Sequence, residues 1–210
     1  KPAADWKVTV RRKASGATVR TLSGGTARGL LTAAWDGRDT AGRLVTNGAY
    51  TWTLTARPAD GQGAALTLSG DVKVTAGTAA PRDYAGNDGV GDVLTLSSSG
   101  TLTVRRGTGT GTLGGTVSGS GWSATARIVP FGDLNGDHCN DVLVRTGGAL
   151  RAYRPACGKA PTPATPYTSL GTSGWNAYDV LTSPGDVDGD GRPDLIGRQS
   201  STGDVYLFKG

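Results

Sequence analysis

Four aspartates lie close together in the ten residues GDVDGDGRPD, which run from Gly185 to Asp194. Two glycines between them allow the backbone to turn tightly enough to aim all four carboxylates at one point. Carboxylates at this density repel one another unless a cation is present, and calcium prefers six to eight oxygen ligands. We therefore predict a calcium loop, with a solvated Asp/Gly turn as the alternative. The predicted ligands are Asp186, Asp188, Asp190, Asp194 and the backbone carbonyl of Arg192.

The same pattern occurs upstream in GDLNGDHCND. Its predicted ligands are Asp133, Asn135, Asp137, Asp141 and the backbone carbonyl of Cys139. A third copy, RDYAGNDGVGD, is altered: it keeps Asp88 and Asp92 but has Gly86 at the second ligand position. Asp83 lies one residue too early, as though one residue had been inserted. The sequence leaves open whether this copy binds calcium.

These loops differ from EF-hand loops. The chain contains no glutamate, so the bidentate ligand that closes an EF-hand is missing. The last aspartate leads into the apolar pair Leu195 and Ile196, which favours a strand. The pattern Asp-x-Asp/Asn-x-Asp-Gly-x-x-Asp-Leu is similar to the calcium loop of FG-GAP/VCBS repeats, known from integrin-type β-propellers and secreted bacterial proteins. This resemblance implies propeller blades that bind Ca²⁺.

The loops mark an internal repeat. Asp92, Asp141 and Asp194 recur at intervals of about 50 residues, a period typical of propellers. The segments GWSATARIVPFGD and GWNAYDVLTSPGD precede the two intact loops at the same distance. We expect each repeat to form a four-stranded blade with a Trp-bearing strand. Residues 79–210 then supply roughly two and a half blades of the four to eight that close a ring. We favour a fragment of a longer chain or a component of an assembly, because the last blade would leave an open edge; stacking without closure is the alternative.

Residues 1–78 form a different, strongly alternating segment. Trp6, Val8 and Val10 alternate with polar residues, and Tyr50 and Trp52 do the same. Period two with intervening turns predicts antiparallel strands in a small sandwich. The stretch WDGRDTAGRLVTNGAYTWTLTA, with VRTLSGG upstream, resembles the immunoglobulin-like domain of the flagellar hook-capping protein. We therefore expect an all-β chain: an immunoglobulin-like β-sandwich over 1–78, followed by propeller-type blades in an incomplete ring over 79–210.

Composition and cysteine usage indicate a secreted protein. The chain of 210 residues has no apolar run long enough to span a membrane. Lys1 and Pro2 lead directly into a polar strand, so we expect a mature or trimmed product rather than a signal peptide. Outside the cell calcium is abundant and cysteines pair, so we predict a disulfide between Cys139 and Cys157. Two buried free thiols are the alternative; a zinc site lacks enough ligands.

No catalytic constellation can be assembled. His138 is the only histidine, and no nucleophile elbow, HExxH motif or P-loop is present. The net charge of +5 comes with no groove-reading motif or stacking platform, so nucleic acid is not expected as a partner. A non-specific attraction to acidic cell walls or polysaccharides is consistent with this charge.

We therefore predict a secreted, extracellular, non-catalytic calcium-binding module for recognition or assembly, with a cell-surface glycan or a protein as partner. The alternatives are an accessory or structural region of a larger secreted hydrolase and a protein-partner docking module. Trp122, Trp175 and Tyr178 could stack on a sugar; packing between blades is the competing interpretation.

Overall fold

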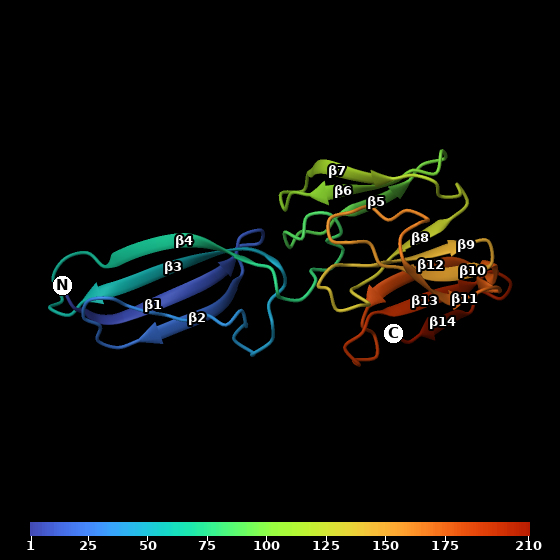
Figure 1. The fold of residues 1–210 in the computed structure, drawn as a ribbon. Coiled ribbons are helices and arrows are strands. Elements are labelled where there is room, and N and C mark those ends of the chain that lie inside the picture. Colours follow the sequence, from blue (N-terminus) through green and yellow to red (C-terminus); the bar gives the residue numbers. More distant parts are fainter. The chain divides into compact units, whose positions relative to one another are not determined.

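The computed structural model describes residues 1–210 and confirms the predicted all-β class (Figure 1). It contains fourteen β-strands and one 3₁₀ turn, η1 (Trp175–Ala177). None of its elements is a helix long and apolar enough to cross a membrane. The chain divides into two compact units, Lys1–Thr78 and Ala79–Gly210, which are described separately below.

The first unit is built on one antiparallel sheet with the strand order β2-β1-β3-β4. The strands are β1 (Ala3–Arg12), β2 (Thr18–Gly24), β3 (Gly48–Pro58) and β4 (Leu66–Val74). The predicted alternation sets its buried face: Val8 and Val10 of β1 lie beside Tyr50 of β3 in one core cluster. Trp35 closes over this face, with its ring 5.4 Å from that of Tyr50.

The layer opposite this sheet is an irregular segment, residues 25–47, rather than a second ladder of long strands. Two aspartates explain why. Asp36 accepts the backbone N–H of Arg38, and Asp39 accepts those of Ala41 and Arg43. Side chains that bond nearby backbone groups stabilise turns at the expense of sheet pairing. These aspartates therefore hold turns.

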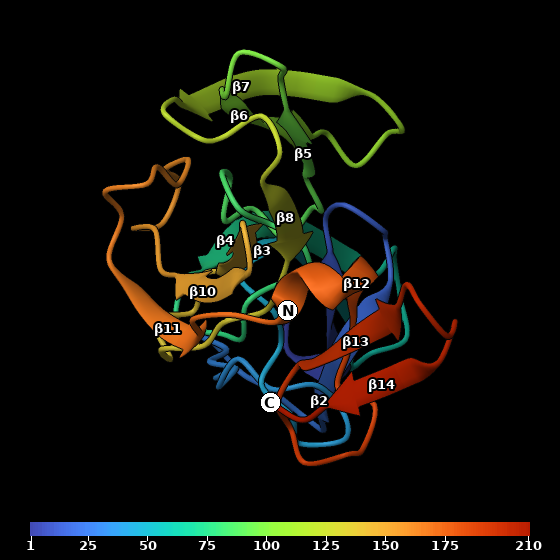
Figure 2. The same ribbon diagram turned by 90° about the vertical axis from the view of Figure 1, so that its right-hand side faces the viewer.

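The second unit contains three antiparallel sheets, ordered β5-β6-β7, β11-β10-β9-β8 and β12-β13-β14. Figure 2 shows β5–β7 at the top, β10 and β11 at the left, β13 and β14 at the right, and β8 near the centre. The strands of the first two sheets are β5 (Val93–Leu96), β6 (Leu102–Gly107), β7 (Leu113–Gly119), β8 (Arg127–Pro130), β9 (Val142–Thr146), β10 (Ala149–Tyr153) and β11 (Tyr167–Gly171). Those of the third are β12 (Tyr178–Gly185), β13 (Asp194–Gln199) and β14 (Val205–Phe208).

Strand β9 shows how the sheets pack. Val142 and Val144 lie in a core cluster with Leu102 of β6, whereas Leu143 lies in another cluster with Leu195 of β13. Successive side chains of a strand point to opposite faces, so the middle sheet is buried on both faces. This explains the uninterrupted apolar run at β9 and gives the face-to-face packing of propeller-type blades.

The two tryptophans of the repeats, Trp122 and Trp175, were expected in strands but lie outside them. Trp122 precedes β8, and Trp175 lies in η1 before β12. The preceding residues, Gly121 and Gly174, have φ angles of 95° and 89°. This left-handed conformation favours glycine and interrupts extended backbone. Each tryptophan therefore follows a bend in the chain at its glycine.

Candidate functional site

The three aspartate loops occupy equivalent places in the second unit. The first loop, Asp83–Asp92, immediately precedes β5; the second loop, Asp133–Asp141, joins β8 to β9; the third loop, Asp186–Asp194, joins β12 to β13. The strands on either side of the second and third loops pair with each other. The sheet therefore fixes where each of these loops begins and ends.

The first aspartate of each loop accepts at least two backbone N–H groups from further along the loop. Asp133 accepts those of Gly136 and His138 at 2.7 and 2.8 Å. Asp186 accepts the N–H groups at the same offsets, from Gly189 and Gly191 at 2.6 and 2.9 Å. These bonds fold the loops around their first carboxylate.

In the first loop the equivalent bonds reach one residue further. Asp83 accepts the N–H groups of Asn87 and Gly89, both at 2.7 Å. The longer offset is what one inserted residue requires, so Asp83 corresponds to Asp133 and Asp186. The pKa of Asp83 is raised by burial, which disfavours its charged form.

The last aspartate of each loop is buried beneath it. One carboxylate oxygen, Oδ2, accepts the N–H of the residue that follows the first aspartate. The pairs are Tyr84 with Asp92 at 2.8 Å, Leu134 with Asp141 at 2.8 Å, and Val187 with Asp194 at 2.7 Å. The three loops therefore share one hydrogen-bonding plan despite their different sequences.

Asp141 is the exception among these buried aspartates. It is 0% exposed, yet its Oδ1 atom has no hydrogen-bond partner. Burial, together with the charges of Asp137 and Asp133, raises the pKa of Asp141 to about 6. A buried carboxylate oxygen without a donor is costly, and a cation in the second loop would give it a partner.

The third loop gathers its carboxylates most closely. Oxygens of Asp186, Asp188 and Asp194 lie within 4.8 Å of one another, a spacing that could hold a metal ion. Lys209 Nζ lies 2.9 Å from Asp188 Oδ2 and lowers the pKa of Asp188. Asp190 instead accepts the N–H of Arg192 at 2.8 Å, so its carboxylate braces the turn that carries the predicted carbonyl ligand.

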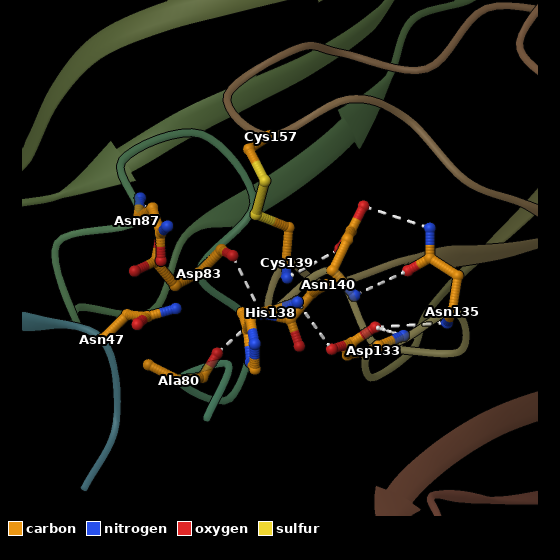
Figure 3. The surroundings of a disulfide bond; sticks show 12 residues. Asn47, Ala80, Asp83, Asn87, Asp133, Asn135, His138, Cys139, Asn140 and Cys157 are labelled. Carbon is orange, nitrogen blue, oxygen red and sulfur yellow. Dashed lines mark hydrogen bonds between the residues drawn. A yellow bond between two sulfur atoms is a disulfide. The ribbon is translucent and has the colours of Figure 1, made fainter. Parts of the chain in front are cut away.

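The second loop has the same brace, because Asp137 accepts the N–H of Cys139 at 2.9 Å. Asn135 Nδ2 donates to Asp137 at 3.1 Å, so its amide would have to turn to offer oxygen to an ion. Cys139 is bonded to Cys157, which confirms the predicted disulfide (Figure 3). Both sulfurs are consumed by this bond, which leaves the cysteine thiols out of any metal site.

Asn140 links the second loop to the first, a role that the sequence did not indicate. The residue is 4% exposed, and its Nδ2 donates to the carbonyls of Ala80 and Asp83 at 2.6 and 2.8 Å. Figure 3 shows Asn140 reaching these carbonyls from beside the disulfide. Both contacts cross more than fifty positions of sequence, so no local pattern could have revealed them.

The predicted ligands of the first loop, Asp88 and Asp92, already accept backbone N–H groups. Asp88 accepts only the N–H of Val90, two residues on, at 2.9 Å. Gly86 lies against the Asp88 carboxylate, where an added Cβ would meet its carbon at 2.8 Å. Asp92 accepts three N–H groups, those of Tyr84, Ala85 and Gly107. Asp92 is therefore held by backbone donors of the loop and of Gly107 in β6.

The three candidate sugar-binding aromatics have different surroundings. Trp122 is 6% exposed, and its Nε1 donates to the Pro161 carbonyl at 3.1 Å. Its ring centroid lies 5.0 Å from that of Tyr153, so Trp122 packs in the core rather than offering a face to a sugar. Trp175 and Tyr178 are half-buried, and both contact Phe208, at 4.9 and 5.5 Å between ring centroids.

Comparison with known proteins agrees with the two units. The model of the FlgD Ig-like domain matches residues 1–60. The model of the FG-GAP-like repeat matches residues 87–144 and 133–197, so each match runs from one aspartate loop to the next. A search among curated proteins found no match.

Proposed function

The chain belongs to the FG-GAP-like repeat family over residues 87–197, with an FlgD Ig-like domain before the repeats, and from this premise we propose that it is a secreted calcium-binding recognition or assembly module. FG-GAP repeats are in general non-catalytic recognition modules. Calcium would stiffen the second and third loops and fix the surface that their sheets present. The accessory region of a larger hydrolase and a protein-docking module remain alternatives within this class.

The observation that carries the proposal is the buried Oδ1 of Asp141, which has no partner in the protein. Its neighbours Asp133 and Asp137 add negative charge. Hard oxygen donors of this kind fit calcium. Asp133, Asp137, Asp141, the Asn135 amide oxygen and the Cys139 carbonyl would hold the ion.

The third loop supports the same proposal independently. Asp186, Asp188 and Asp194 already converge, and Asp190 with the Arg192 carbonyl would complete the set. Lys209 neutralises one of these carboxylates in the metal-free protein and would give way to the ion. Asp88 and Asp92 of the first loop are weaker candidates, because backbone donors occupy Asp92.

The Cys139–Cys157 disulfide supports an extracellular location, because such bonds persist in oxidising compartments. Calcium is also abundant there, whereas weak sites of extracellular modules would stay empty in the cytosol. Both features favour a role outside the cell.

Thermal unfolding of the whole chain, in EDTA and in calcium, tests the proposal. An ion that binds only the folded state raises its stability by about 2.7 kcal/mol at a hundredfold excess over Kd. We expect the transition of the second unit to move upward in calcium and to move less in magnesium, which prefers octahedral geometry. An identical melting curve in EDTA and calcium would refute calcium binding.

A cell-surface glycan is a second candidate ligand, favoured by the half-buried cluster of Trp175, Tyr178 and Phe208 beside exposed Tyr206. Sugars commonly stack on such ring faces. Retention on chitin and on a glycan array, with calcium present, should fall for Trp175→Ala and Tyr178→Ala. Tyr167→Ala removes an exposed ring from β11 and serves as the control. Equal retention of all three variants would rule out this surface.

A further inference from the structure

The last aspartates of the three loops differ in how many backbone donors they hold. Asp92 accepts three N–H groups, and so does Asp194, from Val187, Asp188 and Gly210. Asp141 accepts one, from Leu134. The missing bonds include the one to Oδ1, which Gly107 supplies to Asp92 and Gly210 supplies to Asp194, each at 3.0 Å.

Strand register identifies the residue that should have supplied this bond to Asp141. The residue after the last aspartate pairs with Arg105 in the first sheet, Tyr153 in the second and Phe208 in the third. Two positions beyond these partners lie Gly107, Pro155 and Gly210. Proline has no N–H, so the middle sheet cannot make the bond that its neighbours make.

The disulfide compensates for the lost bond in the middle sheet. Cys157 follows Pro155 by two residues and is tied to Cys139 of the second loop, with 5.6 Å between their Cα atoms. The segment after β10 therefore stays beside the loop without a hydrogen bond to Asp141. The disulfide holds this segment in place, and Asp141 Oδ1 is left without a hydrogen-bond donor.

We propose that Pro155 is an affinity-determining residue: it withholds the N–H that closes the equivalent aspartates, and thereby keeps Asp141 Oδ1 available to calcium. The second loop then depends on the ion, whereas the first loop, which has Gly86 at the second ligand position and whose Asp92 is closed by backbone donors, binds none. This inference rests on the proposed calcium binding and concerns which loops use it. Pro155 is a positioning residue that acts through Asp141.

Pro155→Ala restores an N–H at this position and is the direct test. Pro163→Ala is the matched control, since Pro163 is an exposed proline of the same β10–β11 connection. Calcium is titrated into the full chain by calorimetry, and melting curves are recorded in EDTA. Pro155→Ala should bind calcium at one site about tenfold to a hundredfold more weakly, as expected for competition with a hydrogen bond to a charged group. It should also melt higher in EDTA, whereas the control should match the wild type in both measurements.

The outcomes separate two kinds of failure. If the wild type binds no calcium, the proposed function fails and this inference fails with it. If wild type and Pro155→Ala bind calcium with equal affinity, the calcium proposal stands and the role of Pro155 is wrong.

Asp92→Asn gives a second test that leaves Pro155 intact. The calcium stoichiometry should be unchanged, because the first loop lacks a ligand at Gly86 and its Asp92 is already closed by backbone donors. Loss of one bound calcium ion would overturn the claim that this loop is independent of calcium.

Discussion

Replacing Asp141 with asparagine should have opposite effects on stability with and without calcium. In the metal-free protein the pKa of Asp141 is raised from 3.8 to about 6. Two pKa units correspond to about 3 kcal/mol of cost for the charged form at neutral pH. Asparagine removes that charge and still offers an oxygen to the Leu134 N–H. Its new NH₂ group can donate to the nearby carboxylates of Asp133 and Asp137.

The expected size follows from these terms. A gain of about 1 to 3 kcal/mol, at about 3 to 5 °C per kcal/mol for a unit of this size, raises the melting temperature in EDTA by roughly 3 to 15 °C. In calcium the same variant loses a ligand of the second loop. Its calcium-induced shift should therefore be smaller than that of the wild type.

Differential scanning calorimetry at neutral pH, with EDTA or calcium, measures both effects. Asp204→Asn is the control, because it makes the same charge change at an exposed turn of the same unit. If Asp141→Asn melts lower in EDTA and keeps the full calcium shift, then Asp141 is not a strained, open ligand and the reasoning fails.

Three further predictions concern the same unit. Replacing Cys139 and Cys157 with serine opens a link across 18 positions and should cost about 3 kcal/mol, measured by urea unfolding; an unchanged midpoint would contradict this. Asn140→Ala removes two buried hydrogen bonds and should lower the unfolding free energy of the second unit alone by about 2 to 3 kcal/mol. A loss of stability confined to the first unit would contradict this. Because the folded-state pKa of Asp141 lies above its unfolded value, the metal-free protein binds more protons folded than unfolded between those values. Its stability relative to Asp141→Asn should therefore fall as pH rises from about 4 to 6 in chelator-stripped buffer, and a rise would reverse the sign of the argument.

In the first unit the alternation of apolar and polar residues predicted the strands but not the layer that packs against them. Period two in Trp6–Val10 and Tyr50–Leu54 predicted the strands, since side-chain direction along a strand depends only on local geometry. The irregular layer opposite them was not predicted, because local turn bonds such as those of Asp36 and Asp39 do not show which segments between them pair as strands.

In the second unit the sequence by itself determined the loops and the cysteine pair. Spacing alone places alternate carboxylates around a tight turn, and burial of apolar strands on either side follows from their composition. Only the tertiary structure decided in which loop the last aspartate keeps a carboxylate oxygen without a hydrogen-bond donor. That depends on strand register, which places Pro155 where the neighbouring sheets have the N–H donors Gly107 and Gly210. It depends also on long-range contacts such as those of Asn140, which arise only when separate sheets pack together.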